Sequence, residues 1–158
     1  MSIFLEPSPA NSYLVQHINL LRSSYKHYLG KDLLDSQLTA AEIAKEIYTA
    51  PFVVVSHDTS PNPIFNYGNQ TALKLFEMTW SEFTSIPSRQ SAEPPNREER
   101  AKLLQTVSSQ GFIEDYSGIR ISKNGQRFTI EQATVWNLID SNHCYCGQAA
   151  IYSHWRYI

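Results

Sequence analysis

The sequence predicts an α+β fold, in which a five-stranded antiparallel sheet has helices on one face and is preceded by amphipathic helices. Three observations predict it. Residues 1–50 carry apolar side chains at helical spacing, two short apolar runs follow Pro51, and three longer strand-like segments occupy residues 113–157. Because helical segments separate the two groups of strands, a single sheet covered by those helices is the economical closure.

The N-terminal region predicts two helices. Residues 11–29 form the first, because an apolar stripe recurs in steps of four and three and Gly30 is placed to end it. Thr39 and Glu42 form a capping box for the second helix, which Pro51 stops. The stripe consists of Leu14, Ile18, Leu21, Tyr25 and Tyr28.

Turns and caps mark the next elements. Residues 52–58 and 64–67 predict a hairpin of two short strands around a turn that contains prolines. Asn69 is placed to cap a third helix, and we expect it to be a cap rather than a ligand contact. Thr79 and Glu82 form a capping box that opens a short fourth helix.

A fifth helix is expected over 96–110, after a loop over 86–95. Asn96 is placed to cap this helix, with Glu99 at the third position, and Gly111 is a natural terminator.

The last third of the chain predicts three strands, 113–122, 127–139 and 144–157. Asn124-Gly125 is a strong hairpin signal between the first two. Alternation along the middle strand gives each face an apolar set, so both faces of the sheet need a cover. One set is Phe128, Ile130, Trp136 and Leu138, and the other is Ala133, Val135 and Ile139.

Residues 1–50 are therefore expected to be a helical extension that caps or dimerises a core of residues 51–158, within a single unit. The apolar stripe can cover the second face from its own chain or from a second copy. Its narrow seam and the low charged content of 18% favour a homodimer through the N-terminal helix.

Composition excludes several classes of protein. With 158 residues and a net charge of −2, the chain has the size of one domain and lacks the basic surface of a nucleic-acid binder. No apolar run approaches the roughly 18 residues that span a membrane. The first residues do not form a secretory signal, and the only cysteines, Cys144 and Cys146, are expected to be reduced thiols in a cytoplasmic protein.

The order of strands and helices resembles the PAS domain, and the residues resemble the MEKHLA family, a PAS-like family of bacterial proteins and of plant class III homeodomain–leucine zipper proteins. The resemblance covers nearly the whole chain. It implies a PAS-like fold and a sensing or interaction role, without DNA reading, because no homeodomain or zipper occurs in these residues. The matching segments are 63–70, 91–93, 97–100, 111–112, 116–119, 125–128, 131–136 and 147–150, with Ala72, Leu73, Phe76, Glu77 and Trp155.

The resemblance does not extend to a cofactor. Flavin-binding PAS domains place a cysteine on a helix in an Asn-Cys-Arg-Phe setting, and haem-binding ones present a histidine from a helix. Here both cysteines lie on the predicted last strand, and helices 69–78 and 96–110 contain no histidine. We therefore predict no cofactor. His143, Cys144 and Cys146 are too few and too closely spaced for a zinc site, so we predict no metal either.

Four arginines are the candidate ligand-binding groups. A guanidinium binds a carboxylate or a phosphate through two parallel hydrogen bonds, so Arg97, Arg100, Arg120 and Arg127 could hold a small acidic ligand. Arg127 is the first choice and Arg120 the second, because hairpin pairing brings these two together. The alternative is structural pairing with nearby acids: Glu93, Glu98, Glu99, Glu114, Asp115 and Glu131.

Three aromatic residues are candidates for the walls of the same site. Tyr67, Tyr116 and Trp136 could line a small-molecule cavity between the sheet and the helices. The alternative is ordinary core packing, in which the tyrosine hydroxyls and the indole N–H meet backbone partners.

The function predicted is a PAS-like sensory or interaction module that binds a small ligand and signals by contact with an unknown protein partner. The alternatives are an enzyme that uses the same cavity and an interaction module whose core is filled by its own side chains. No pair of acid and base groups in separated environments is identifiable, so we assign no catalytic residue and expect no enzyme.

Overall fold

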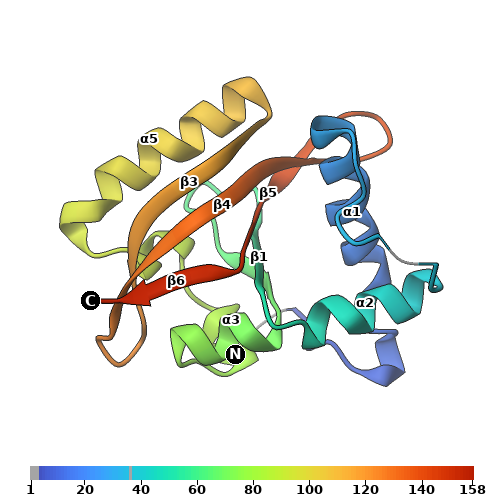
Figure 1. Cartoon of the computed structure of the whole chain (residues 1–158), viewed down its shortest axis with the longest axis horizontal. Helices are drawn as coiled ribbons and strands as arrows, with labels where there is room; N and C mark the ends of the chain where they lie inside the picture. The colour runs from blue at the N-terminus through green and yellow to red at the C-terminus, as the bar shows by residue number, and fades with distance from the viewer. Residues whose placement is uncertain (1–3, 36) are drawn as a thin grey trace.

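The computed structural model describes residues 4–35 and 37–158. It confirms the α+β class: antiparallel strands form one sheet in the order β2-β1-β5-β4-β3, with helices on both sides (Figure 1). The sixth strand, β6, pairs with β4 beyond the end of β5. The strands are β1 (Val53–His57), β2 (Phe65–Gly68), β3 (Phe112–Ile121), β4 (Arg127–Ile139), β5 (Tyr145–Tyr152) and β6 (His154–Tyr157).

The sixth strand arises because the predicted last strand is interrupted at Ser153. Its first part, β5, pairs with residues 134–139 of β4, and its second part, β6, pairs with residues 128–131 of the same strand. The two parts therefore continue along one side of β4, while β3 occupies the other side.

Helices cover both faces of the sheet. One face, the α5 face, carries α3 (Gln70–Phe76), α4 (Trp80–Phe83) and α5 (Pro94–Gln110). The opposite face, the α1 face, carries α1 (Val15–Leu29) and α2 (Ala40–Thr49). Figure 1 shows α5 at the upper left of the sheet and α1 and α2 at the right.

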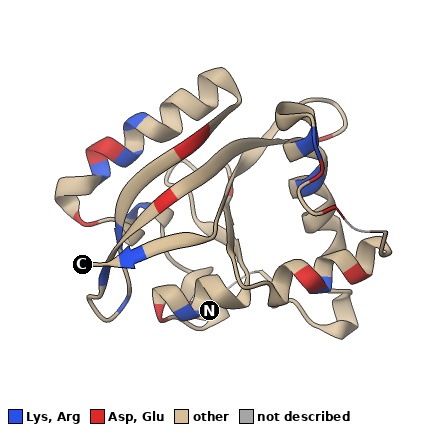
Figure 2. Cartoon of the chain, in the orientation of Figure 1, with Lys and Arg blue, Asp and Glu red and all other residues tan. Residues whose placement is uncertain are grey.

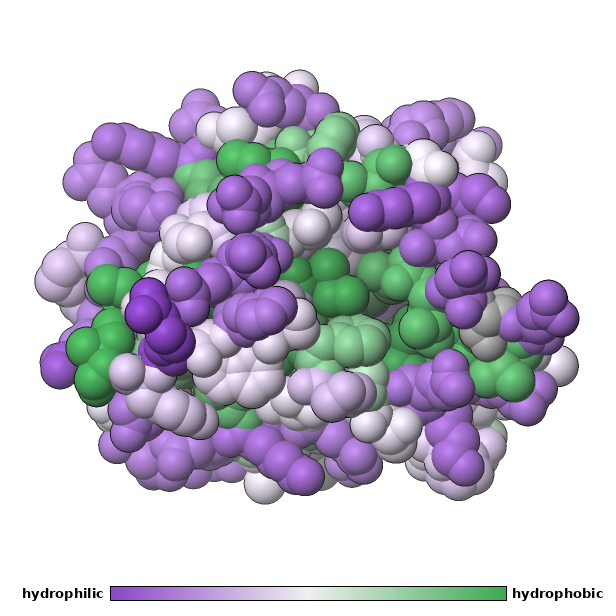
Figure 3. Space-filling view, in the orientation of Figure 1, coloured by the Kyte–Doolittle hydropathy of each residue, from purple (hydrophilic) through white to green (hydrophobic). Residues whose placement is uncertain are grey.

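The apolar stripe of α1 packs on the sheet of its own chain. Ile18 and Leu21 are fully buried, and the Tyr25 ring meets the Trp136 ring edge to face at 5.0 Å between centroids. The stripe therefore provides the cover for its own sheet, one of the two arrangements that the sequence left open. Figure 3 shows hydrophilic side chains around most of the rim of the molecule in this view.

The phase of alternation changes in the middle of β4. Phe128, Ile130, Ala133 and Val135 belong to the core of the α5 face, whereas Trp136 and Leu138 belong to the core of the α1 face. Gln132 has a φ of 53°, and this left-handed residue inserts an extra step into the strand. The prediction that Phe128, Ile130, Trp136 and Leu138 share a face was therefore wrong, because strict alternation does not survive such an irregularity.

The predicted caps are confirmed at three helices. Thr39 and Thr79 each form a capping box, at the starts of α2 and α4. The Asn69 side chain caps α3 by accepting from the backbone N–H of Ala72 at 3.1 Å, and its amide nitrogen donates to two backbone carbonyls. Since the Asn69 side chain is used entirely within the fold, its role as a cap is confirmed.

Two helix starts differ from the prediction. Helix α1 begins at Val15 rather than at residue 11, because Ser12, Tyr13 and Leu14 all have left-handed backbone angles. Helix α5 begins at Pro94 rather than at residue 96, since proline suits the first helical position, where no backbone N–H is needed.

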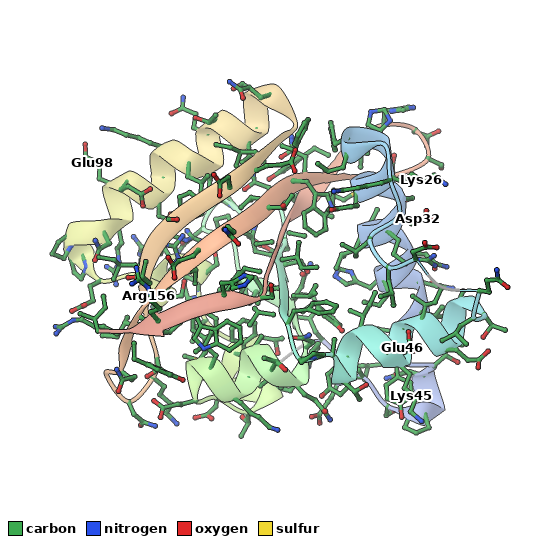
Figure 4. All side chains as sticks on the ribbon, in the orientation of Figure 1. Lys26, Asp32, Lys45, Glu46, Glu98 and Arg156 are labelled. Atoms are coloured by element: carbon green, nitrogen blue, oxygen red, sulfur yellow. The ribbon has the colours of Figure 1, made fainter. Side chains whose placement is uncertain are left out.

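The charged residues are spread over the fold. Figure 2 shows acidic and basic residues interspersed on the ribbon, in keeping with the net charge of −2. Nζ of Lys26, in the last turn of α1, lies 3.2 Å from Oδ1 of Asp32, just beyond the helix (Figure 4). Nε of Arg156, on β6, donates to Oε1 of Glu131 at 2.9 Å. In the part of the chain described, no helix is long and apolar enough to cross a membrane.

Candidate ligand-binding cavity

A small cavity lies between the α5 face of the sheet and helix α5. Its volume is about 60 Å³, which is room for a few water molecules or one compact ligand. Apolar side chains from β1, β2, β4, α3 and α5 form most of its wall. The polar residues that line it are Ser56, His57, Ser91, Arg100, Tyr116, Arg120, Gln148 and Tyr152.

Arg100 projects from α5 and is 8% exposed. Its Nη2 atom donates to the Ser88 hydroxyl at 3.0 Å. Within the described residues, neither Nε nor Nη1 of Arg100 has a protein acceptor. Burial and the neighbouring charge of Arg120 lower the pKa of Arg100 to about 9, so the guanidinium still carries its charge near neutral pH.

Arg120 enters the cavity from β3 and is 7% exposed. Its Nη1 atom donates to the Ile119 carbonyl at 2.9 Å, and Nη2 donates to the Tyr116 hydroxyl at 3.1 Å. The Tyr116 hydroxyl in turn donates to Glu99 at 3.0 Å. Tyr116 therefore stands between the buried cation and an acid that lies at the surface of α5.

The two guanidiniums lack a carboxylate partner. Among residues 4–35 and 37–158, no carboxylate oxygen lies within 4.0 Å of a nitrogen of Arg100 or Arg120. A buried charge without a partner is costly, and two like charges in one cavity add mutual repulsion. The cavity is therefore a region of unneutralised positive charge inside an otherwise apolar wall.

The remaining polar groups are neutral near pH 7. Burial raises the pKa of Tyr152 and of Tyr116, so both phenols keep their protons. Burial, aided by the charge of Arg100, lowers the pKa of His57 below its ordinary value. The cavity thus offers hydroxyl and imidazole groups as hydrogen-bonding partners beside the two fixed cations.

Arg127, the first choice from the sequence, lies outside the cavity. It is exposed and forms a two-point ion pair with Glu93, in which Nη2 and Oε2 are 2.9 Å apart. The Arg127 guanidinium holds the pKa of Glu93 below its ordinary value. The hairpin register pairs Arg127 with Ile121 and Arg120 with Phe128, so the two arginines are neighbours in the ladder but occupy different environments. The expectation that they share one site is therefore corrected.

Arg97 is also outside the cavity. Its Nε atom donates to the Ala92 carbonyl at 2.9 Å, which ties the first turn of α5 to the segment before it. Of the four candidate arginines, the structure brings together Arg100 and Arg120.

Two of the three candidate aromatics lie on the α1 face. Trp136 is fully buried and donates its indole N–H to the Leu21 carbonyl at 3.2 Å, as the core-packing alternative describes. Tyr67 is also fully buried there, and among the described residues its hydroxyl has no hydrogen-bond partner. The change of phase at Gln132 explains the wrong placement of Trp136. Only Tyr116 lines the cavity.

Among the lining residues that sequence reasoning missed are His57, Gln148 and Tyr152. Their positions depend on the pairing of β1 with β5, in which His57 lies opposite Gln148 and Val53 opposite Tyr152. The available signal was that His57 follows Val53 and Val55 at two-residue spacing and therefore shares their face. The pairing of distant strands cannot be read from local spacing.

The cysteines lie away from the cavity. Cys144 and Cys146 are free thiols at the turn before β5 and at its beginning, and Cys144 is exposed. The described residues include no group of three or more His, Cys, Asp or Glu side chains placed to hold a metal ion.

Solved structures share this architecture. The PAS domain of a protein from Colwellia psychrerythraea aligns with 74% of this chain and 94% of its own, at 19% identity and a TM-score of 0.62. A structure described as an RNA-binding light-oxygen-voltage receptor aligns with 77% of this chain and 34% of its own, at 12% identity and a TM-score of 0.63. These likenesses show a PAS fold.

Curated relatives are longer proteins. The homeobox-leucine zipper protein ATHB-14 of Arabidopsis thaliana is 27% identical over 163 residues, and ATHB-9 of the same plant is 29% identical over 151 residues. These alignments cover 99% and 90% of this chain but 18% of each relative, so the chain spans less than a fifth of their length. The sequence profile of the MEKHLA domain matches residues 15–157. The chain therefore belongs to the MEKHLA domain family.

Proposed function

We propose that this protein is a PAS-like sensory module that binds a compact anion between Arg100 and Arg120 and signals by contact with a protein partner. The observation that supports it is the pair of buried guanidiniums without a carboxylate partner among the described residues. A ligand with negatively charged oxygens neutralises the charges of both guanidiniums, and it accepts hydrogen bonds from the free Nε and Nη1 atoms of Arg100.

The size and the walls of the cavity limit which ligands can enter it. A volume of about 60 Å³ admits a short carboxylic acid or an inorganic oxyanion. The walls around the arginines include Leu103, Ile130 and Val135, which suit a short hydrocarbon tail. A solved structure that aligns at a TM-score of 0.59 is described by its work on a flavin analogue in a light-oxygen-voltage domain. The cavity of this chain is too small for the three-ring system of a flavin.

We propose a binding role rather than catalysis. The described lining has one imidazole and two phenols, with neither a carboxylate nor a thiol. Acid–base catalysis uses two titratable groups whose environments separate their pKa values. The cavity therefore suits recognition of a charged ligand, and the proposed receiver of the signal is a protein partner.

Thermal-shift measurements test the proposal with two sets of probes, inorganic phosphate and the monocarboxylates formate, acetate and propionate, each against sodium chloride at equal ionic strength. We expect at least one probe to raise the melting temperature of the wild type and of Arg127→Gln, whose arginine is outside the cavity. The same probe should leave the melting temperatures of Arg100→Gln and Arg120→Gln unchanged. No shift with any probe would favour a ligand-free interaction module, and turnover of a bound probe would favour an enzyme.

A further inference from the structure

The imidazole of His57 faces two oxygen atoms, one at each ring nitrogen. Nδ1 lies 3.0 Å from the Asp58 carbonyl oxygen, and Nε2 lies 3.1 Å from Oε1 of Gln148. A neutral imidazole has one N–H and can donate to only one of them, whereas an imidazolium donates to both.

The orientation of the Gln148 amide is fixed by its other contacts. Its Nε2 atom donates to the Leu104 carbonyl at 3.0 Å and to Oδ1 of Asn137 at 3.1 Å. The Leu104 carbonyl can only accept, and the Asn137 amide is itself oriented because its nitrogen donates to the Val107 carbonyl. The atom that Gln148 turns toward His57 is therefore its oxygen, an acceptor.

The buried arginines of the cavity oppose a cationic His57 in the absence of a ligand. Arg100 faces the cavity from α5 and Arg120 from β3, while Tyr116, Tyr152 and Gln148 contribute neutral groups from β3 and β5. The carboxylate of Asp58, the residue after His57 and just beyond the end of β1, accepts from Ser60 and from the backbone of the adjoining turn. A third buried cation beside two others is unfavourable until a negative charge enters.

This inference rests on the proposed anion site and deepens it. We propose that the anion binds together with a proton, which His57 takes from solvent onto its second ring nitrogen. The imidazolium then donates to both the Asp58 carbonyl and Gln148. One N–H bond of the ring forms as one O–H bond of a solvent species breaks, and the reverse transfer returns the proton to solvent when the anion leaves.

The consequence is that affinity depends on acidity as well as on anion concentration. Where His57 is neutral in the free protein and protonated in the complex, the dissociation constant falls by up to about tenfold for each unit of decreasing pH. The cavity would then bind a short carboxylate most strongly in mildly acidic conditions.

The test uses formate, acetate and propionate, which stay ionised between about pH 6 and about pH 8. We expect the most strongly bound of the three to bind the full chain at least about fivefold more tightly at the lower pH. Nitrogen-15 spectra of the wild type near pH 7 should show the His57 ring changing from neutral to imidazolium as that carboxylate is added. His57→Gln should lose the pH dependence, whatever its absolute affinity, and His154→Gln, which changes an exposed histidine, should keep it.

The outcomes separate this inference from the proposed function. Failure of all three carboxylates and of inorganic phosphate to bind at either pH would overturn both. Binding with equal affinity at the two pH values, or a His57 ring that stays neutral in the complex, would overturn only the proton uptake. If His57→Gln does not fold, the nitrogen-15 spectra of the wild type still show whether the His57 ring takes up a proton when the carboxylate binds.

Discussion

Arg120 and Tyr116, both on β3, are joined by a hydrogen bond of 3.1 Å from the guanidinium Nη2 to the phenol oxygen. The same phenol donates to Glu99 on α5, so a single hydroxyl connects the buried cation with an acid of the helix. This relationship makes Tyr116 a structural support of the site, and it explains how Arg120 keeps its position without a carboxylate in direct contact.

Replacing Tyr116 by phenylalanine tests that support. We expect Tyr116→Phe to lower the free energy of unfolding by about 1–3 kcal/mol, because Arg120 Nη2 loses a buried acceptor. Urea unfolding measures it. The control is Tyr157→Phe, which changes an exposed tyrosine and should stay within about 0.5 kcal/mol of the wild type. Equal free energies of unfolding for the two variants would show that the Tyr116 hydroxyl does not stabilise the fold.

Replacing Arg100 by methionine tests whether the unpaired charges oppose folding. In buffer free of carboxylate and phosphate, we expect Arg100→Met to be as stable as the wild type or more stable by up to about 3 kcal/mol, because one buried charge and its repulsion with Arg120 disappear. Arg127→Met removes only an exposed ion pair that solvent screens, and it should change the free energy of unfolding little. Strong destabilisation by Arg100→Met would mean that its charge is compensated within the protein.

Trp136 anchors α1 to the sheet. Truncation by Trp136→Ala should cost about 3–5 kcal/mol, because a fully buried ring and its hydrogen bond to the Leu21 carbonyl are lost. Thermal melting measures it, with Tyr157→Ala as the exposed control. A melting temperature within a degree of the parent would contradict the packing described for α1.

His17 should make the fold sensitive to acid. Its Nε2 lies 2.9 Å from the Ser56 hydroxyl, and burial lowers its pKa to about 4. In the unfolded chain, His17 takes up a proton near the ordinary histidine pKa of about 6.5, whereas in the folded protein it stays neutral. The free energy of unfolding therefore falls as the pH drops from about 6.5 towards 4. The expected loss due to His17 is roughly 1–3 kcal/mol.

Urea unfolding at several pH values measures this effect as a difference between proteins. His17→Asn should lose less stability on acidification than the wild type, and His154→Asn should behave as the wild type does. Identical acid sensitivity in His17→Asn and the wild type would assign the effect to other groups.

Local signals in the sequence predicted most of the fold, and they did so where the physical cause is local. The capping boxes at Thr39 and Thr79, the Asn69 cap and the Asn124-Gly125 turn each depend on residues within a few positions, and the helices and strands follow them. The order of the strand and helix segments predicted a single sheet, and the resemblance to the PAS domain implied the same architecture.

The site was predicted only in part because it depends on relations that local spacing does not contain. Arg100, Arg120 and Tyr116 line the cavity, and their binding of a ligand stays a prediction. His57 and Gln148 meet through the pairing of β1 with β5, and Trp136 is turned to the α1 face by the left-handed residue Gln132. Long-range register and a single irregular backbone angle thus decided which candidates converge.

The central claim is that an anion lies between Arg100 and Arg120, and a high-resolution crystal structure of the full chain grown with sodium propionate tests it most directly. We expect density for a carboxylate whose oxygens lie about 2.7–3.1 Å from nitrogens of Arg100 and Arg120, with the hydrocarbon end against the apolar wall. Crystals grown with sodium chloride alone should lack that density. Density for water alone in both crystals, or guanidiniums turned away to pair with acidic side chains, would contradict the account.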